Sequence, residues 1–99
     1  MTLTNEDRDY IEYITKWHLN KLPDGLAIEG KNHLDDLSVE KLVSLYHGTE
    51  QLISELTIDI KENQNYELLF KAIDYLSTKS LLESTIENKL SGQNIVFLH

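Results

Sequence analysis

Residues 38–90 read SVEKLVSLYHGTEQLISELTIDIKENQNYELLFKAIDYLSTKSLLESTIENKL, and the fold depends on this stretch. Its apolar residues recur every three or four positions, which is the period of an amphipathic α-helix. The polar run Lys61-Glu62-Asn63-Gln64-Asn65 divides it into two arms of similar length. Two long helices joined by a short connector pack side by side and antiparallel. The sequence therefore predicts a long helical hairpin.

The first arm begins with a helix-capping signal. The Ser38 hydroxyl can accept a hydrogen bond from the backbone N–H of Lys41, and Leu37 and Leu42 occupy the two positions of a hydrophobic staple. These signals predict a helix over residues 38–61. Its apolar stripe comprises Leu42, Leu45, Tyr46, Thr49, Leu52, Ile53, Leu56 and Ile60. The opposite face, expected to be in water, carries Lys41, Glu55, Asp59 and Glu62.

The second arm predicts a helix over residues 66–90, with Asn65 as its N-cap. Its apolar residues are Leu68, Leu69, Ala72, Ile73, Tyr75, Leu76, Leu82, Ile86 and Leu90. The polar run 77–80 and the capping box 80–83 leave two alternatives, one continuous helix or a break. The absence of Pro and Gly from this arm favours the continuous helix. Ser91-Gly92 then predicts its end.

A third helix is predicted over residues 5–21, capped by Thr4 and ended by the turn Pro23-Asp24-Gly25. The apolar segments 26–29 and 94–98 are too short for helices of their own, and they could pair as a minor two-stranded element. The fold class is therefore all-α: a three-helix bundle built on the hairpin, in one domain covering residues 1–99.

Composition and charge limit the partners. The net charge is −8, and residues 1–60 carry twelve acidic and five basic side chains, against five and four in residues 61–99. So acidic a surface argues against direct binding to nucleic acid or anionic membrane and suits a basic protein partner. The chain lacks cysteine, and residues 1–7 do not resemble a signal peptide, which favours a cytoplasmic location. The preference for Ile and Asn over Ala and Arg is typical of AT-rich bacterial or phage genomes.

No residue pattern predicts catalysis or metal binding. Zinc on a helix needs two ligands three or four positions apart, and no two of His18, His33, His47 and His99 have that spacing. A Glu-x-x-His motif, a nucleophile elbow and a phosphate-binding loop are all absent from the sequence. We therefore expect no metal, no cofactor and no enzymatic activity.

Two groups of residues are candidates for binding a partner. Tyr10, Tyr13 and Trp17 share one edge of the predicted helix 5–21, where they either belong to the core or form an exposed aromatic anchor. Glu55, Asp59 and Glu62 follow one face of the predicted helix 38–61 and could meet a basic partner. The acidic residues could equally serve solubility alone.

These features predict a small interaction protein, such as an adaptor, an inhibitor or an immunity factor, acting through its surface. One alternative is a small-ligand binding module with a pocket between helix 5–21 and the hairpin. Another is an acidic mimic of nucleic acid that inhibits a nucleic-acid enzyme. A homodimer is also expected, because the first helix is shorter than the hairpin arms and would leave apolar residues such as Ile58, Ile60 and Leu68 uncovered.

Overall fold

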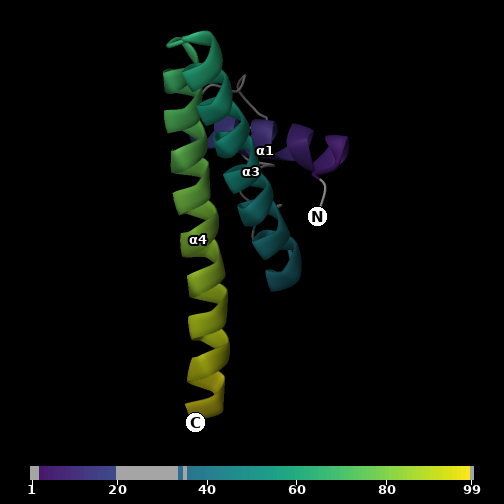
Figure 1. Ribbon diagram of the computed structural model, residues 1–99. Coiled ribbons are helices and arrows are strands. Elements are labelled where there is room, and N and C mark those ends of the chain that lie inside the picture. The colour runs from purple at the N-terminus through teal and green to yellow at the C-terminus, as the bar shows by residue number, and fades with distance from the viewer. Residues whose placement is uncertain (1–2, 20–33, 35, 99) are drawn as a thin grey trace.

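The computed structural model describes residues 3–19, 34 and 36–98, and of 92–98 only the backbone. It contains three helices, α1 (Asn5–His18), α3 (Val39–Asn63) and α4 (Leu68–Leu98), and no strand occurs in this part of the chain (Figure 1). The predicted all-α fold and the antiparallel hairpin, formed by α3 and α4, are confirmed. The molecule is elongated along the hairpin, with principal extents of 54 × 32 × 21 Å.

The start of α3 is fixed by the predicted cap. The Ser38 side chain accepts a hydrogen bond of 3.1 Å from the Lys41 backbone N–H. At the other end Gln64 adopts a left-handed conformation with φ of 51°, which turns the chain out of the helix. The backbone N–H of Leu68 donates to the carbonyl of Asn65 at 3.2 Å across a turn at residues 66–67. Helix α4 therefore begins at Leu68, two residues after the predicted start, and the prediction of Asn65 as its N-cap is wrong. A short connector of this kind makes the two arms antiparallel neighbours.

The second arm forms one continuous helix through residues 77–80, as the absence of Pro and Gly favoured. Two other predictions about its end are wrong. The Ser91-Gly92 pair does not end α4, which continues to Leu98, so residues 94–98 are helical and form no minor strand. A glycine inside a helix costs about 1 kcal/mol, which is small when each further residue of a growing helix adds a hydrogen bond. The proposed strand partner, 26–29, lies outside the described residues.

Helix α1 lies across the hairpin on one side (Figure 1). The Thr4 hydroxyl accepts a hydrogen bond from the Asp7 backbone N–H at 3.1 Å, which confirms the predicted cap. The helix ends at His18, three residues before the predicted end; the turn at 23–25 and His33 lie outside the described residues. The helix approaches α3 closely at Gly48, where an added Cβ would stand 3.1 Å from Ile11 Cδ1.

The core lies where the three helices meet. Its buried apolar residues are Ile11, Ile14, Leu34, Leu42, Leu45, Leu52, Tyr75 and Leu82. The predicted stripe of α3 is largely correct, but that of α4 is not, because Leu69, Ile73 and Leu76 are exposed. Helix α4 has apolar residues on more than one side, and only one side faces α1 and α3.

Candidate functional site

The predicted aromatic group mainly attaches α1 to the hairpin. Tyr10, Tyr13 and Trp17 are all half-buried, and Tyr10 and Trp17 pack against the core. The rings of Tyr10 and Tyr13 have their centroids 6.5 Å apart, so the structure does bring these two together. Burial raises the pKa of Tyr10. Much of this aromatic surface therefore contributes to folding.

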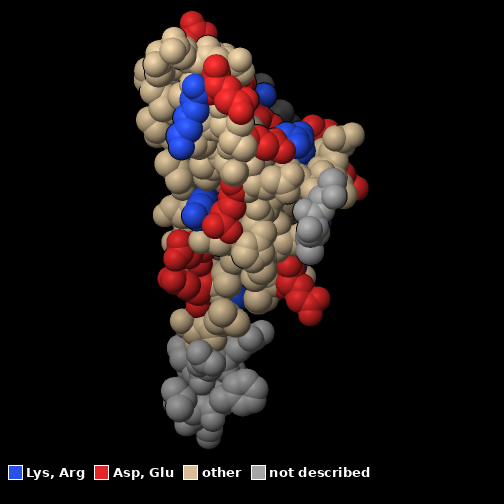
Figure 2. Space-filling model, in the orientation of Figure 1, with Lys and Arg blue, Asp and Glu red and all other residues tan. Residues whose placement is uncertain are grey.

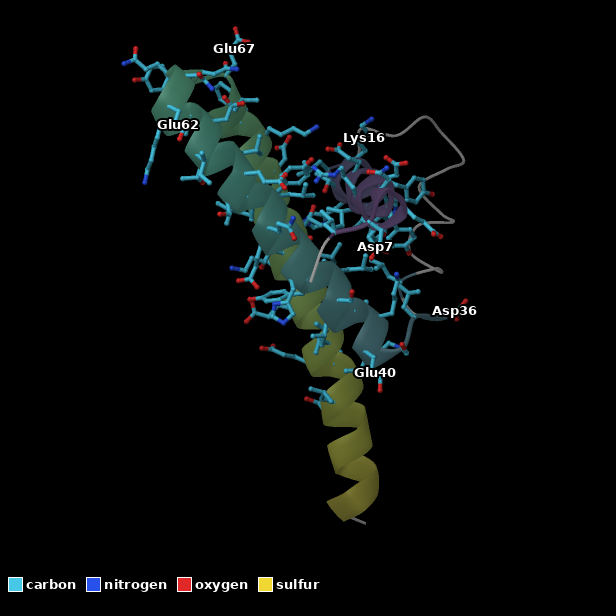
Figure 3. The ribbon with its side chains drawn as sticks, turned by 45° about the vertical axis from the view of Figure 1, so that its right-hand side comes forward. Asp7, Lys16, Asp36, Glu40, Glu62 and Glu67 are labelled. Atoms are coloured by element: carbon cyan, nitrogen blue, oxygen red, sulfur yellow. The ribbon has the colours of Figure 1, made fainter. Side chains whose placement is uncertain are left out.

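The predicted acidic face follows the flank of α3 that is directed toward α1. Glu55 forms an ion pair with Arg8 of α1 at 3.2 Å, and this hydrogen bond lowers the pKa of Glu55. Asp59 accepts a hydrogen bond from the side chain of Asn63. Glu62 is exposed near the connector, at one end of the hairpin (Figure 3). The three carboxylates share a flank, but they do not form a uniformly free acidic surface.

Three further ion pairs join different helices. The Nζ of Lys41 on α3 lies 2.6 Å from Oδ1 of Asp7 on α1. The Nζ of Lys71 on α4 lies 2.9 Å from Oε1 of Glu12 on α1. Lys79 of α4 lies 3.4 Å from Glu50 of α3. Together with the pair of Arg8 and Glu55, these contacts occupy many of the basic side chains.

A groove separates the first half of α3 from the later part of α4. It encloses about 250 Å³ and is lined by Val43, Tyr46, His47, Glu83, Ile86 and Glu87. Figure 1 shows α3 diverging from α4 toward this end of the hairpin, and in Figure 2 acidic side chains gather over the lower part of α4. The floor is apolar, since Val43, Tyr46 and Ile86 are half-buried there. We call this feature the α3–α4 groove.

One edge of the α3–α4 groove already holds a cation. The Lys79 ammonium nitrogen lies 5.4 Å from the centroid of the Tyr46 ring, within the range of a cation–π contact. His47 lies beside Tyr46, with ring centroids 5.6 Å apart, and its Nδ1 is 2.9 Å from a carboxylate oxygen of Glu50. The hydrogen bond from His47, and then that from Lys79, lower the pKa of Glu50. Aromatic and acidic groups thus combine here to hold positive charge.

The α4 edge of the groove carries two carboxylates of a different kind. Glu83 and Glu87 are both exposed and stand four positions apart on α4, where like charges repel each other. Neither forms an ion pair with another described residue of the chain. A positive group placed between them would relieve the repulsion. The pair therefore gives the α3–α4 groove a preference for cationic groups.

The histidines do not assemble into a metal site in the described part of the chain, where no three metal-binding side chains gather. His18 is exposed and His47 is paired with Glu50. Within those residues, no helix is long and apolar enough to cross a membrane. Comparison with known proteins found no matching family model, no matching curated protein and no matching solved structure.

Sequence reasoning missed the α3–α4 groove. Its lining residues on α3 are 36 or more positions away from those on α4, and the two groups meet only because of the register between the helices. The repeated carboxylates Glu83 and Glu87, on either side of the apolar Ile86, were the local signal available. That signal also fits an ordinary solvent-exposed helix face, so it could not identify the groove alone.

Proposed function

We propose that this protein is a small acidic interaction protein, an adaptor, inhibitor or immunity factor, that binds a basic segment of a protein partner in the α3–α4 groove. The observation that carries the proposal is an apolar floor bordered by Glu83 and Glu87, two carboxylates that form no ion pair with a described residue. Such a surface suits Lys and Arg, which have a long apolar stem and a charged head. The stem would lie on Val43 and Ile86, and the head would reach the carboxylates.

The two parts of the groove would contribute differently to binding. Burying the stem removes apolar surface from water, which stabilises the complex. The exposed carboxylates would mainly accelerate encounter and select a positively charged partner. The Lys79 contact with Tyr46 supports this assignment, because it is an intramolecular example of a cation held at the same edge.

The alternatives have weaker support. The small-ligand alternative places its pocket between α1 and the hairpin, whereas the α3–α4 groove lies within the hairpin. The volume of this groove, about 250 Å³, is also below the about 300–1,000 Å³ of most metabolite sites and suits a side chain better. Mimicry of nucleic acid would require a dense row of free negative charges. The acidic residues labelled in Figure 3 instead lie apart from one another, from Glu62 and Glu67 at the connector to Glu40 at the start of α3, and Asp7 is paired with Lys41. The flank of Glu55, Asp59 and Glu62 remains a second candidate surface for a basic partner.

The test compares the two acidic surfaces directly. The wild-type chain would be used to capture and identify a protein partner, and binding rates would then be measured at low and moderate salt. Glu83→Lys with Glu87→Lys should slow association at least about tenfold at low salt, and added salt should reduce the difference. The matched control, Asp59→Lys with Glu62→Lys, makes the same change in charge on the other flank.

The two double variants give distinguishable outcomes. Slow association for the groove variant alone supports the α3–α4 groove as the contact. Slow association for the control alone would assign the contact to the flank of Glu55, Asp59 and Glu62. Equal rates for all three proteins would contradict an electrostatic contact at either surface. Circular dichroism should show the same helix content in each, because all four positions are on the surface of a helix.

A further inference from the structure

The outer side of α4 near the connector is unusually apolar. Five large side chains there are exposed to between 46% and 75%, with Phe70 the most exposed. We call them the α4 stripe: Tyr66, Leu69, Phe70, Ile73 and Leu76. The four on α4 recur at helical spacing and Tyr66 lies in the turn just before the helix, so the stripe is not a set of scattered contacts. A patch of this kind on a small protein marks an interaction surface.

No described helix can cover the α4 stripe. The buried residues of α4 in this region are Tyr75, Thr78 and Leu82, and they contact α1 and α3. At about 100° per residue the stripe falls on the opposite side of the helix. Figure 1 agrees, because α1 and α3 lie to one side of α4 and its other side is open. The stripe is also separate from the α3–α4 groove, which lies between the two helices.

The area of the stripe is sufficient for a dimer. A fully exposed large side chain presents about 200 Å², so five that are a little over half exposed present roughly 600 Å². Two copies that bury this surface against each other would bury about 1,200 Å², the lower limit for a specific interface. A symmetric pair needs one self-complementary patch, and the stripe supplies it.

The charge around the stripe also favours a second copy. The chain has a net charge of −8, but residues 61–99 contribute five acidic and four basic side chains, so this half is nearly neutral. Two copies can therefore approach here without strong repulsion, and a basic partner gains little. We propose that the α4 stripe binds the α4 stripe of a second copy of this chain, with the two α4 helices antiparallel and Ile73 at the two-fold axis.

The antiparallel orientation follows from the residues beyond the stripe. At about 100° per residue, Glu83 and Glu87 fall on the flank of α4 between the stripe and the α3–α4 groove, beyond Leu76 and Ser80. In a parallel pair, Glu83 and Glu87 of one copy would lie beside the same two carboxylates of the other copy, and like charges repel each other. In an antiparallel pair centred on Ile73, the two acidic segments lie at opposite ends. Each then lies near the polar connector of the other copy.

The first experiment measures the oligomeric state of the full chain by sedimentation equilibrium. The expected result is a species of twice 11.5 kDa at tens of micromolar. Ile73→Glu should raise the dissociation constant at least ~30-fold, the effect of a central hot-spot residue. Ile58→Glu is the matched control, because Ile58 is a similarly exposed isoleucine at 53% but lies on α3, outside the stripe. It should leave the dissociation constant unchanged.

The second experiment uses single cysteines, which are informative because the chain has none of its own. A disulfide requires Cα atoms within about 7 Å. Ile73→Cys should therefore cross-link to its own copy on mild oxidation. Leu69→Cys alone and Ser77→Cys alone should not cross-link. Each position lies four residues from the two-fold axis, so the two equivalent cysteines are offset by about 12 Å along the helices. A mixture of the Leu69→Cys and Ser77→Cys chains should cross-link.

Three other outcomes of these experiments would overturn the proposed antiparallel dimer. Efficient self-linking by both Leu69→Cys and Ser77→Cys would show a parallel pair. A monomer whose Cys at position 73 reacts slowly with a thiol reagent would show that another part of the same chain covers the stripe. A monomer with a fast-reacting Cys at position 73 would leave the stripe free for a different protein. None of these results would alter the case for the α3–α4 groove.

Discussion

The hydroxyl groups of Thr15 on α1 and Thr78 on α4 lie 2.6 Å apart in the core, where Thr78 is fully buried. Thr15 also donates to the backbone carbonyl of Ile11 at 2.7 Å, so its oxygen can accept the proton of Thr78, for which the Asp74 carbonyl at 3.3 Å is the other acceptor. The contact joins residues 63 positions apart and fixes how α1 sits on the hairpin. No buried side-chain polar atom in the described part lacks a partner.

Replacing either threonine with valine should therefore destabilise the fold. Thr15→Val and Thr78→Val should each cost about 1 kcal/mol of unfolding free energy, because each leaves its partner hydroxyl without one bond. The double variant should cost less than the sum, since no unpaired hydroxyl remains between the helices. Urea unfolding of the four proteins measures this coupling. Strictly additive costs would show that the two hydroxyls do not interact.

Gly48 gives a second prediction, about the contact of α1 with α3. An added Cβ would stand 2.7 Å from Leu3 Cδ1 and 3.1 Å from Ile11 Cδ1. Gly48→Ala should change stability by less than about 0.5 kcal/mol, because the gain in helix propensity offsets a small shift of the Leu3 side chain. Gly48→Leu should cost at least about 2 kcal/mol, because the larger side chain forces α1 away. Thermal unfolding of both variants checks the contrast, and an unaffected leucine variant would mean that α1 does not pack closely here.

A third prediction concerns Glu12, which accepts hydrogen bonds from Tyr75 and Lys71. Partial burial opposes the charge of Glu12, but these two bonds outweigh it and lower its pKa. Burial, and then the bond to Glu12, raise the pKa of Tyr75. The contribution of Glu12 to the free energy of unfolding is thus complete above its ordinary pKa of 4.5. It is lost as the pH falls toward the lowered pKa of the folded state. Stability from Tyr75 is complete below pH 10 and is lost at higher pH.

The variant Glu12→Gln tests this assignment. It should cost about 1 kcal/mol near neutral pH, since Glu12 is only partly buried, and it should reduce the loss of stability on both sides of neutrality. Glu40→Gln is the control, because Glu40 is exposed at the far end of α3 (Figure 3). Denaturation midpoints measured from about pH 3 to pH 10.5 provide the comparison. Identical pH profiles for Glu12→Gln and the wild type would assign the dependence to other groups.

Local signals predicted the helices well. The hydroxyls of Thr4 and Ser38 were identified as caps from their neighbours, and both accept the expected backbone hydrogen bond. The end of α4 was placed too early because Gly92 weakens a helix without necessarily stopping it. Such signals act over a few residues, so they describe starts better than the length of a helix that is already growing.

Long-range features could not be predicted from the sequence. Apolar residues surround much of α4, so periodicity could not decide that Tyr75 is buried while Phe70 and Ile73 are exposed. The α3–α4 groove depends on the position of Tyr46 relative to Ile86, which the register of the two helices determines. Packing partners therefore decide which apolar side becomes the core.

The most direct test of the α3–α4 groove is an NMR titration of the ¹⁵N-labelled chain with a synthetic amphipathic helical peptide that carries Arg and Leu on one side. Saturable shifts should be largest at the backbone amides of Val43, Tyr46, His47 and Ile86, and they should disappear in the variant with Glu83→Lys and Glu87→Lys. Shifts that instead centre on Glu55, Asp59 and Glu62, or that persist unchanged in the groove variant, would contradict the account.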